Sequence, residues 1–145
     1  VLIFRQVFSM DPDMGAEWLE GRFAENGWEN AFRWRVYDYY HSNTHEVLGV
    51  YAGNAILHLG GEQGQQIRVS LGDVIVLPAG TGHKSISHSD DFAVVGAYPG
   101  GAGPDLIRLE DERPEGVRDK VDQVPLPDHD PLNGKSDEGL LKLWK

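Results

Sequence analysis

Short apolar segments separated by glycine-rich turns make up most of the chain between residues 28 and 98. They are too short for helices and are rich in β-branched and aromatic residues, as strands are. Many short strands at even spacing predict an all-β sandwich or barrel rather than an α/β fold. We expect strands at residues 32–41, 46–51, 55–59, 66–70, 74–77, 83–87 and 92–98.

The first 27 residues predict one strand and the one clear helix of the chain. Residues 1–8, VLIFRQVF, have the length and composition of a strand. In the helix expected at 12–26, an aspartate at 11 or 13 can cap the start, Pro12 suits the first turn and Gly27 can follow the end. An apolar stripe at helical spacing between residues 18 and 23 predicts the buried face of this helix.

Beyond residue 98 the chain is rich in glycine, proline and charged residues. This composition predicts an extended tail over 99–145, with one helical turn near 114–122. A length of 145 residues is that of one domain. We therefore expect a single domain over 1–145, in which the N-terminal strand and helix of 1–27 and the tail flank a core at 39–98.

The net charge of −10 and the absence of cysteine narrow the function classes. An acidic chain is a poor match for nucleic-acid phosphates or an anionic membrane surface, so we expect neither partner. Without cysteine there are no disulfides, thiol nucleophiles or thiolate metal sites, which fits a cytoplasmic protein. The apolar runs are far shorter than a membrane span, and VLIFRQVF carries Arg5 and lacks the pattern of a signal peptide.

Ionisable side chains crowd the start of a segment that is otherwise built for burial. In YYHSNTHEVLGVYAG, His41, His45 and Glu46 come just before the apolar run 47–51. Burying such groups is costly unless something compensates them. A bound metal ion is one such compensation, so the pattern indicates a candidate metal site.

The segment GDVIVLPAGTGHKSIS holds a second signal. Pro78 fixes φ and Gly80 can take a positive φ, so LPAG predicts a tight turn that brings His83 onto the next strand. Side chains inside a small barrel are normally apolar filler, so polar ones gathered there suggest a site.

These two segments resemble the two conserved motifs of the cupin superfamily. The spacing His41-x4-Glu46-x6-Gly53 matches the first motif from its second histidine onward. The second motif is matched at Gly72, Pro78, Gly80 and His83. Its final asparagine is replaced by Ser87. Phrases of the tail, such as VPLPDHDPLNG, resemble a bacterial group of small cupins, the YjlB-like group.

The resemblance implies a double-stranded β-helix, the jelly-roll barrel of cupins, with a metal ion held by His41, Glu46 and His83. Two imidazoles and one carboxylate suit a divalent transition metal, namely iron, manganese, nickel or zinc, with open coordination positions. The first histidine of the family motif is replaced by Tyr39. Tyr39 shares a face with His41 under the period-2 rule of strands, so we expect it to point inward.

Several interpretations of this replacement remain open. Tyr39 can be a packed aromatic, can hydrogen-bond a metal-bound water, or can itself ligate as a phenolate. Alternatively, His45 can turn in and restore a third imidazole. We favour a site of three ligands with Tyr39 beside it. Because Glu46 as a ligand cannot also be a free base, Tyr39 and His45 are the candidate catalytic acid–base groups.

Two arginines and a tyrosine continue this face if the strand 32–41 is unbroken: Arg33, Arg35 and Tyr37. An arginine in the mouth of the barrel could hold an anionic substrate by a bidentate pair. The alternative is that these arginines lie at a sheet edge and face water. The remaining histidines are expected outside the site: His58 as a satisfied strand residue, His88 and His129 in polar loops.

The sequence leaves three functions open. The favoured one is a metal-dependent enzyme for a small molecule, with dioxygenase, isomerase or lyase chemistry, of which an oxygenase is the preferred class. The second is a non-catalytic module that binds or senses a small ligand, with or without a metal. The third is a structural building block, since the apolar first strand could pair across a two-fold axis and form a homodimer.

Overall fold

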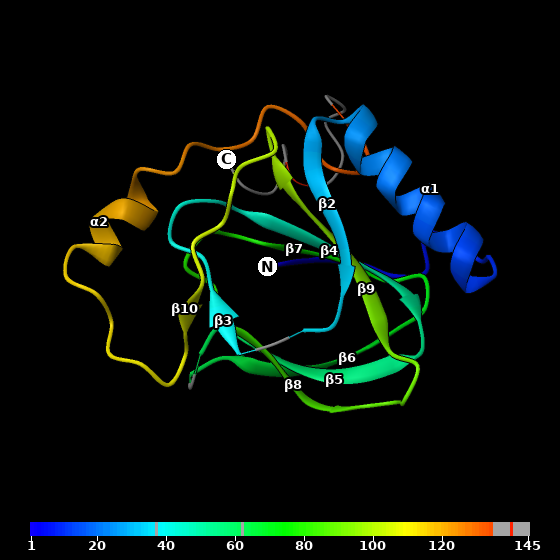
Figure 1. Ribbon diagram of the computed structural model, residues 1–145, viewed down its shortest axis with the longest axis horizontal. Coiled ribbons are helices and arrows are strands. Elements are labelled where there is room, and N and C mark those ends of the chain that lie inside the picture. Colours follow the sequence, from blue (N-terminus) through cyan, green and yellow to red (C-terminus); the bar gives the residue numbers. More distant parts are fainter. Residues whose placement is uncertain (37, 62, 135–139, 141–145) are drawn as a thin grey trace.

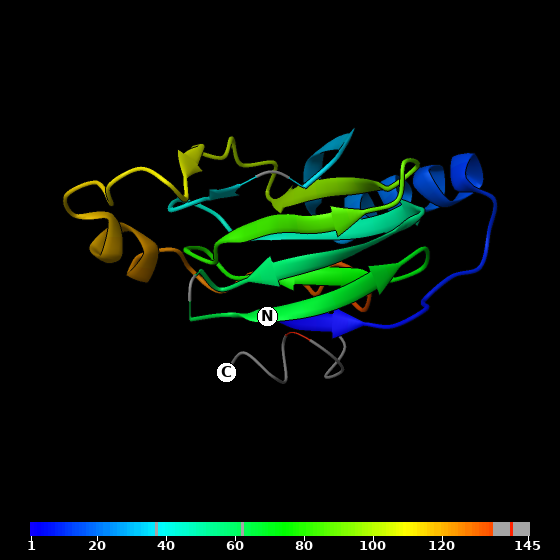
Figure 2. The ribbon, with the colours of Figure 1, turned by 90° about the horizontal axis from the view of Figure 1, so that it is seen from below.

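The computed structural model describes residues 1–36, 38–61, 63–134 and 140. Within these residues, two antiparallel sheets of five strands face each other (Figures 1 and 2). The first sheet contains, in spatial order, β1 (Leu2–Phe4), β7 (Val74–Leu77), β4 (Glu46–Ala52), β9 (Ala93–Pro99) and β2 (Trp28–Trp34). The second contains β10 (Ile107–Arg108), β3 (Tyr39–Tyr40), β8 (His83–His88), β5 (Asn54–Leu59) and β6 (Gln65–Ser70). The predicted jelly-roll class is confirmed.

Alternation along the strands of the first sheet separates two apolar clusters. Leu48 on β4 and Ile75 on β7 point into the sandwich and join a cluster with residues of the second sheet, such as Leu57 on β5. Their neighbours Val47 and Val76 point to the other face. All five side chains are buried, which is why these strands read as continuous apolar runs in the sequence.

The outer face of the first sheet is covered by α1 (Pro12–Glu25), as Figure 1 shows beside β2 and β9. The helix begins after Asp11 with Pro12 in its first turn, and Gly27 follows it at φ 79°. Leu19 and Phe23 are fully buried against the sheet, in the cluster of Val47 and Val76. The expected helix and its buried stripe are therefore confirmed.

The strand expected at 32–41 is wrong, because the chain changes sheets within it. β2 ends at Trp34 and pairs with β9 in the first sheet, whereas β3 begins at Tyr39 and pairs with β8 and β10 in the second. The strand expected at 1–8 is also shorter, since β1 ends at Phe4 and Gln6 takes a positive φ of 48°. Tyr37 lies outside the described residues.

The tail adds β10 to the second sheet and carries the short helix α2 (Val117–Asp122) at the side of the sandwich opposite α1 (Figure 1). The expected helical turn is thus confirmed, while β10 was not expected. The tail then returns to the body, where the Trp28 indole donates to the His129 carbonyl at 2.9 Å. The final apolar phrase GLLKLW lies outside the described residues except for Leu140, which is buried.

No helix among the described residues has the length and apolar character needed to span a membrane.

Candidate metal centre

A cavity of about 630 Å³ opens between the two sheets at the end where β3, β4 and β8 begin or end. Its volume is within the range of small-molecule sites. Aromatic and aliphatic side chains form most of its wall, with a few polar groups among them. The lining residues are Phe32, Trp34, Arg35, Val36, Tyr39, His41, Glu46, Leu48, His83, Tyr98, Leu106 and Arg108.

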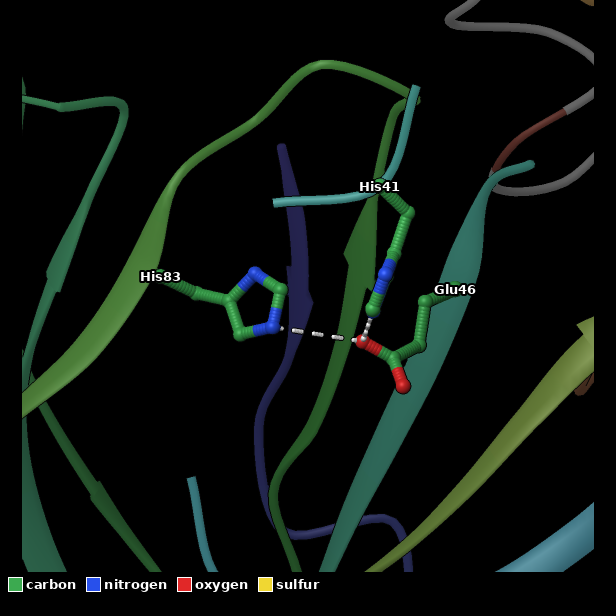
Figure 3. A group of neighbouring side chains, drawn as sticks. All are labelled: His41, Glu46 and His83. Carbon is green, nitrogen blue, oxygen red and sulfur yellow. Dashed lines mark ion pairs between the residues drawn. The ribbon is translucent and has the colours of Figure 1, made fainter. Parts of the chain in front are cut away.

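Three of the lining side chains, His41, Glu46 and His83, converge on one point and form what we call the buried triad (Figure 3). Glu46 opens β4 in the first sheet, His83 opens β8 in the second, and His41 follows β3. Glu46 Oε1 lies 3.3 Å from His41 Nε2 and 3.5 Å from His83 Nε2. One ligand atom from each residue lies within 4.8 Å of the others, and all three side chains are buried.

Backbone carbonyls orient both imidazoles. A carbonyl can only accept, so His41 donates from Nδ1 to the Asp105 carbonyl at 2.5 Å, and His83 donates from Nδ1 to the Thr81 carbonyl at 3.2 Å. In the neutral rings this leaves the Nε2 lone pairs directed at Glu46. Metal-binding histidines are held in this way in general.

The charges of the buried triad are poorly compensated by the protein alone. Glu46 Oε1 is buried and has no hydrogen-bond partner among the described residues. Burial lowers the pKa of His83. Burial also opposes protonation of His41, but the neighbouring Glu46 carboxylate outweighs it and raises the pKa of His41. A cation between the three groups, whether a proton or a metal ion, would relieve the repulsion between their lone pairs.

The predicted LPAG turn holds the two motif segments together. Gly80 has a φ of 84°, as expected, and its N–H donates to the His41 carbonyl at 2.7 Å. The preceding N–H, of Ala79, donates to His45 Nδ1 at 2.9 Å. His45 donates in turn from Nε2 to the Pro125 carbonyl at 2.9 Å. The turn that delivers His83 is therefore fixed against the segment that carries His41.

This bonding places His45 away from the cavity, in contrast to the alternatives that gave it a ligand or acid–base role. Both of its ring nitrogens contact backbone atoms, and burial lowers the pKa of the imidazole. His45 connects the turn to the tail. Of the other histidines, His58 on β5 contacts the Gly61 carbonyl. His88 is exposed but ends β8 instead of lying in the expected loop.

Tyr39 lines the cavity as expected and is half-buried. It pairs with His83 across β3 and β8, and its hydroxyl hydrogen-bonds Arg108, whose pKa it raises. Of the two arginines on the expected strand, Arg35 lines the cavity. Arg33 leaves it and forms a two-point pair with Glu20 on α1, with N–O distances of 2.7 and 3.1 Å.

Two residues of the site were not expected from the sequence. Tyr98 lines the cavity beside His41, with ring centroids 5.9 Å apart. Burial, followed by the charge of Glu46 and a hydrogen bond to it, raises the pKa of the Tyr98 phenol. Side chains alternate between the two faces of a strand, so Val94 and Tyr98 share one face. This alternation could have indicated that Tyr98 points inward.

Asp105 is the second unexpected residue, and it supports His41 from the tail. Its carbonyl accepts from His41, while its carboxylate accepts from the Ser42 N–H at 2.7 Å, from the Ser42 hydroxyl and from Lys120 Nζ at 3.1 Å. Partial burial opposes ionisation, but the hydrogen bonds of Ser42 and Lys120 outweigh it and lower the pKa of Asp105. No motif spacing predicts this contact, because 63 residues separate Ser42 from Asp105.

Comparison with known proteins places the chain in a family. It is 46% identical over 122 residues to the uncharacterized protein YjlB of Bacillus subtilis strain 168, a match that covers 82% of this chain and 73% of the relative. The chain belongs to the YjlB family. With both motifs on a jelly roll, this YjlB-family chain is a member of the cupin superfamily. No protein-family model matches it.

Similar solved structures are more distant. One is the oxalate decarboxylase of Bacillus subtilis, with 21% identity, a TM-score of 0.44, and coverage of 55% of the YjlB-family chain and 21% of the enzyme. Another is an uncharacterized protein with a double-stranded β-helix domain from Klebsiella pneumoniae, with 21% identity, a TM-score of 0.43, and coverage of 52% and 70%. Since these matches span about half of the chain, the family assignment rests on the YjlB relative and the motif residues.

Proposed function

We propose that the protein binds one divalent transition metal ion through His41, Glu46 and His83. The single observation that carries this proposal is the buried Glu46 oxygen, which has no hydrogen-bond partner in the described part of the chain while two histidine Nε2 atoms lie 3.3 and 3.5 Å away. Leaving such a carboxylate uncompensated is costly. A metal ion accepts all three lone pairs at once, whereas a single proton satisfies fewer of them.

The donor set fits iron, manganese, nickel or zinc, because each is bound by mixed imidazole and carboxylate ligands. With three protein ligands and open positions, any of these ions would supply Lewis acidity, and a redox-active one such as iron or manganese would also supply one-electron chemistry with dioxygen. We propose on this basis that the protein is a metal-dependent enzyme for a small molecule, with an oxygenase as the preferred class.

The chain itself would contribute orientation and exclusion of water. Apolar side chains such as those of Phe32 and Leu48 line the same cavity as the buried triad. The Tyr98 phenol, whose pKa is raised, stays protonated and can hold the Glu46 carboxylate by a hydrogen bond. Tyr39, bonded to Arg108, lines the same cavity and can contact a substrate there.

The test begins with metal content. Protein purified without chelator is expected to contain one transition metal ion per chain by elemental analysis, with anomalous scattering between His41, Glu46 and His83. Exchange of His83 for alanine should remove the ion, whereas the matched exchange of the exposed His88 should not. Oxygen uptake with a panel of small organic acids and alcohols then tests the enzyme class. Metal-free wild-type protein that gains no ion from any of the four metals would contradict the proposal.

A second candidate, the non-catalytic ligand-binding module, is favoured by one observation. The position of the first motif histidine is held by Tyr39, whose hydroxyl is engaged by Arg108 rather than by the buried triad. Under this alternative the cavity binds its ligand with substoichiometric metal. Ligand binding that is unchanged by a chelator, together with no turnover under any metal, would favour the module over the enzyme.

A further inference from the structure

The mouth of the cavity has an uneven distribution of charge. Apart from the buried triad, the formally charged side chains among the described lining residues are Arg35 and Arg108. Both belong to a protein with a net charge of −10. They come from edge strands of different sheets, since Arg35 follows β2 of the first sheet and Arg108 lies in β10 of the second.

Neither arginine forms an ion pair with a buried carboxylate among the described residues. Arg35 donates to the Asp90 carbonyl at 3.1 Å, and no ion pair joins it to a carboxylate within the described part of the chain. Arg108 bonds the Tyr39 hydroxyl and pairs with Glu110 at 3.2 Å, but the side chains of Arg108 and Glu110 are more than half exposed. An exposed pair of this kind contributes little, because water screens both charges, so an incoming anion can replace Glu110.

Each arginine has a large exposed apolar neighbour at the same mouth. Trp34 precedes Arg35 and is 56% exposed, and Leu106 lies two residues before Arg108 and is 63% exposed. A ligand with only a charged group would leave these side chains in water. A ligand with an apolar body as well as an anionic group would cover them.

We propose that the cavity binds a small organic anion with an apolar body, whose carboxylate or phosphate group is attracted to the positive charge of Arg35 and Arg108. Guanidinium groups bind both kinds of anion through paired hydrogen bonds. The apolar body lies against Trp34 and Leu106 and directs the other end of the ligand toward the buried triad. This inference rests on the proposed function. The negative charge of Glu46 would repel an anionic ligand, and a metal ion at the buried triad would offset that charge.

The test uses the fluorescent aromatic anion 8-anilinonaphthalene-1-sulfonate and its neutral analogue N-phenyl-1-naphthylamine. Both are titrated into metal-free and metal-loaded protein. We expect one anionic dye per chain and a roughly tenfold weaker affinity in each of the variants Arg35→Gln and Arg108→Gln, which corresponds to loss of one charged contact. The neutral dye should bind all proteins alike within about twofold. Arg33→Gln is the matched control, because Arg33 is bound to Glu20 outside the cavity.

Displacement of the anionic dye from wild-type protein identifies the anion without any variant. 3-Phenylpropanoate or phenyl phosphate should displace it, and the stronger of the two assigns the head group, while neutral 3-phenylpropanamide should not. Equal displacement by the amide, or unchanged affinity in both arginine variants, would overturn the inference. Because the titration is repeated without metal, loss of anion binding is distinguished from absence of the metal site, which elemental analysis reports separately.

Discussion

The buried carboxylate of Glu46 faces two imidazole nitrogens, so we expect a bound metal ion to contact it directly. A metal present at about 100 times its dissociation constant is expected to stabilise the folded protein by about 2.7 kcal/mol. Glu46→Gln should lose this stabilisation, measured as the shift in melting temperature on adding metal. Glu110→Gln, which alters an exposed carboxylate, should retain it. An equal metal-induced shift in Glu46→Gln would contradict the assignment.

Asp105 is expected to act as a positioning residue for His41. Asp105→Asn weakens the hydrogen bonds from Ser42 and Lys120 that hold the carbonyl facing His41. Loss of such support typically lowers metal affinity about 10–100-fold, and we expect a decrease of that size in a competition titration with a metal indicator. The control is Asp111→Asn, an exposed change nearby on the tail, which should leave the affinity unchanged.

His45 offers the opposite contrast, since it supports the fold and lies outside the cavity. His45→Ala leaves the Ala79 N–H and the Pro125 carbonyl without their partner. We expect a loss of about 1–3 kcal/mol in the free energy of unfolding by urea, with one metal ion per chain retained. His88→Ala should change neither quantity by a measurable amount. Loss of metal without loss of stability would return His45 to the candidate ligands.

At the scale of elements, the strands of the motif core and the buried triad could be predicted, whereas the crossing between sheets could not. Glu46 opens a continuous apolar strand and His83 opens the strand that follows the LPAG turn, so their motif spacing fixes them at the same end of the sandwich. Between Trp34 and Tyr39 the sequence stays rich in aromatic and charged residues, and nothing local marks the change of sheet. Only pairing with β9 on one side and β8 on the other separates β2 from β3.

Gly96 on β9 has no side chain, which leaves room for Phe32 and Glu46 beside it. A Cβ atom on Gly96 would lie 2.5 Å from Phe32 Cζ and 3.3 Å from Glu46 Oε2. Gly96→Ala should therefore displace the Phe32 ring into the cavity and cost about 1–3 kcal/mol of stability, measured by chemical unfolding. Gly103→Ala is the matched control, because no atom of the other described residues, its two chain neighbours aside, lies within 4 Å of the added methyl group. A fully stable Gly96→Ala protein would show that this contact is loose.

At the scale of the whole molecule, we propose that residues 1–145 fold as one domain that forms a homodimer through β1. This strand is at the edge of the first sheet, paired on one side with β7. Sedimentation velocity should show a dimer at micromolar concentration. Val1→Lys, which adds charge where the side chain is 48% exposed, should raise the dimer dissociation constant. Met14→Lys, on α1, should leave it unchanged, and a wild-type monomer would remove the proposal.

The bond between His41 and Asp105 ties an imidazole near the start of the motif core to a residue 64 positions later in the chain. Thermodynamic linkage then requires that an ion favouring the ordered imidazole also favours the docked tail. Protection of the segment around Asp105 against proteolysis and hydrogen exchange should consequently increase when the proposed metal site is occupied. A chain truncated after residue 98 would keep every motif residue, but we expect it to bind the metal ion more weakly.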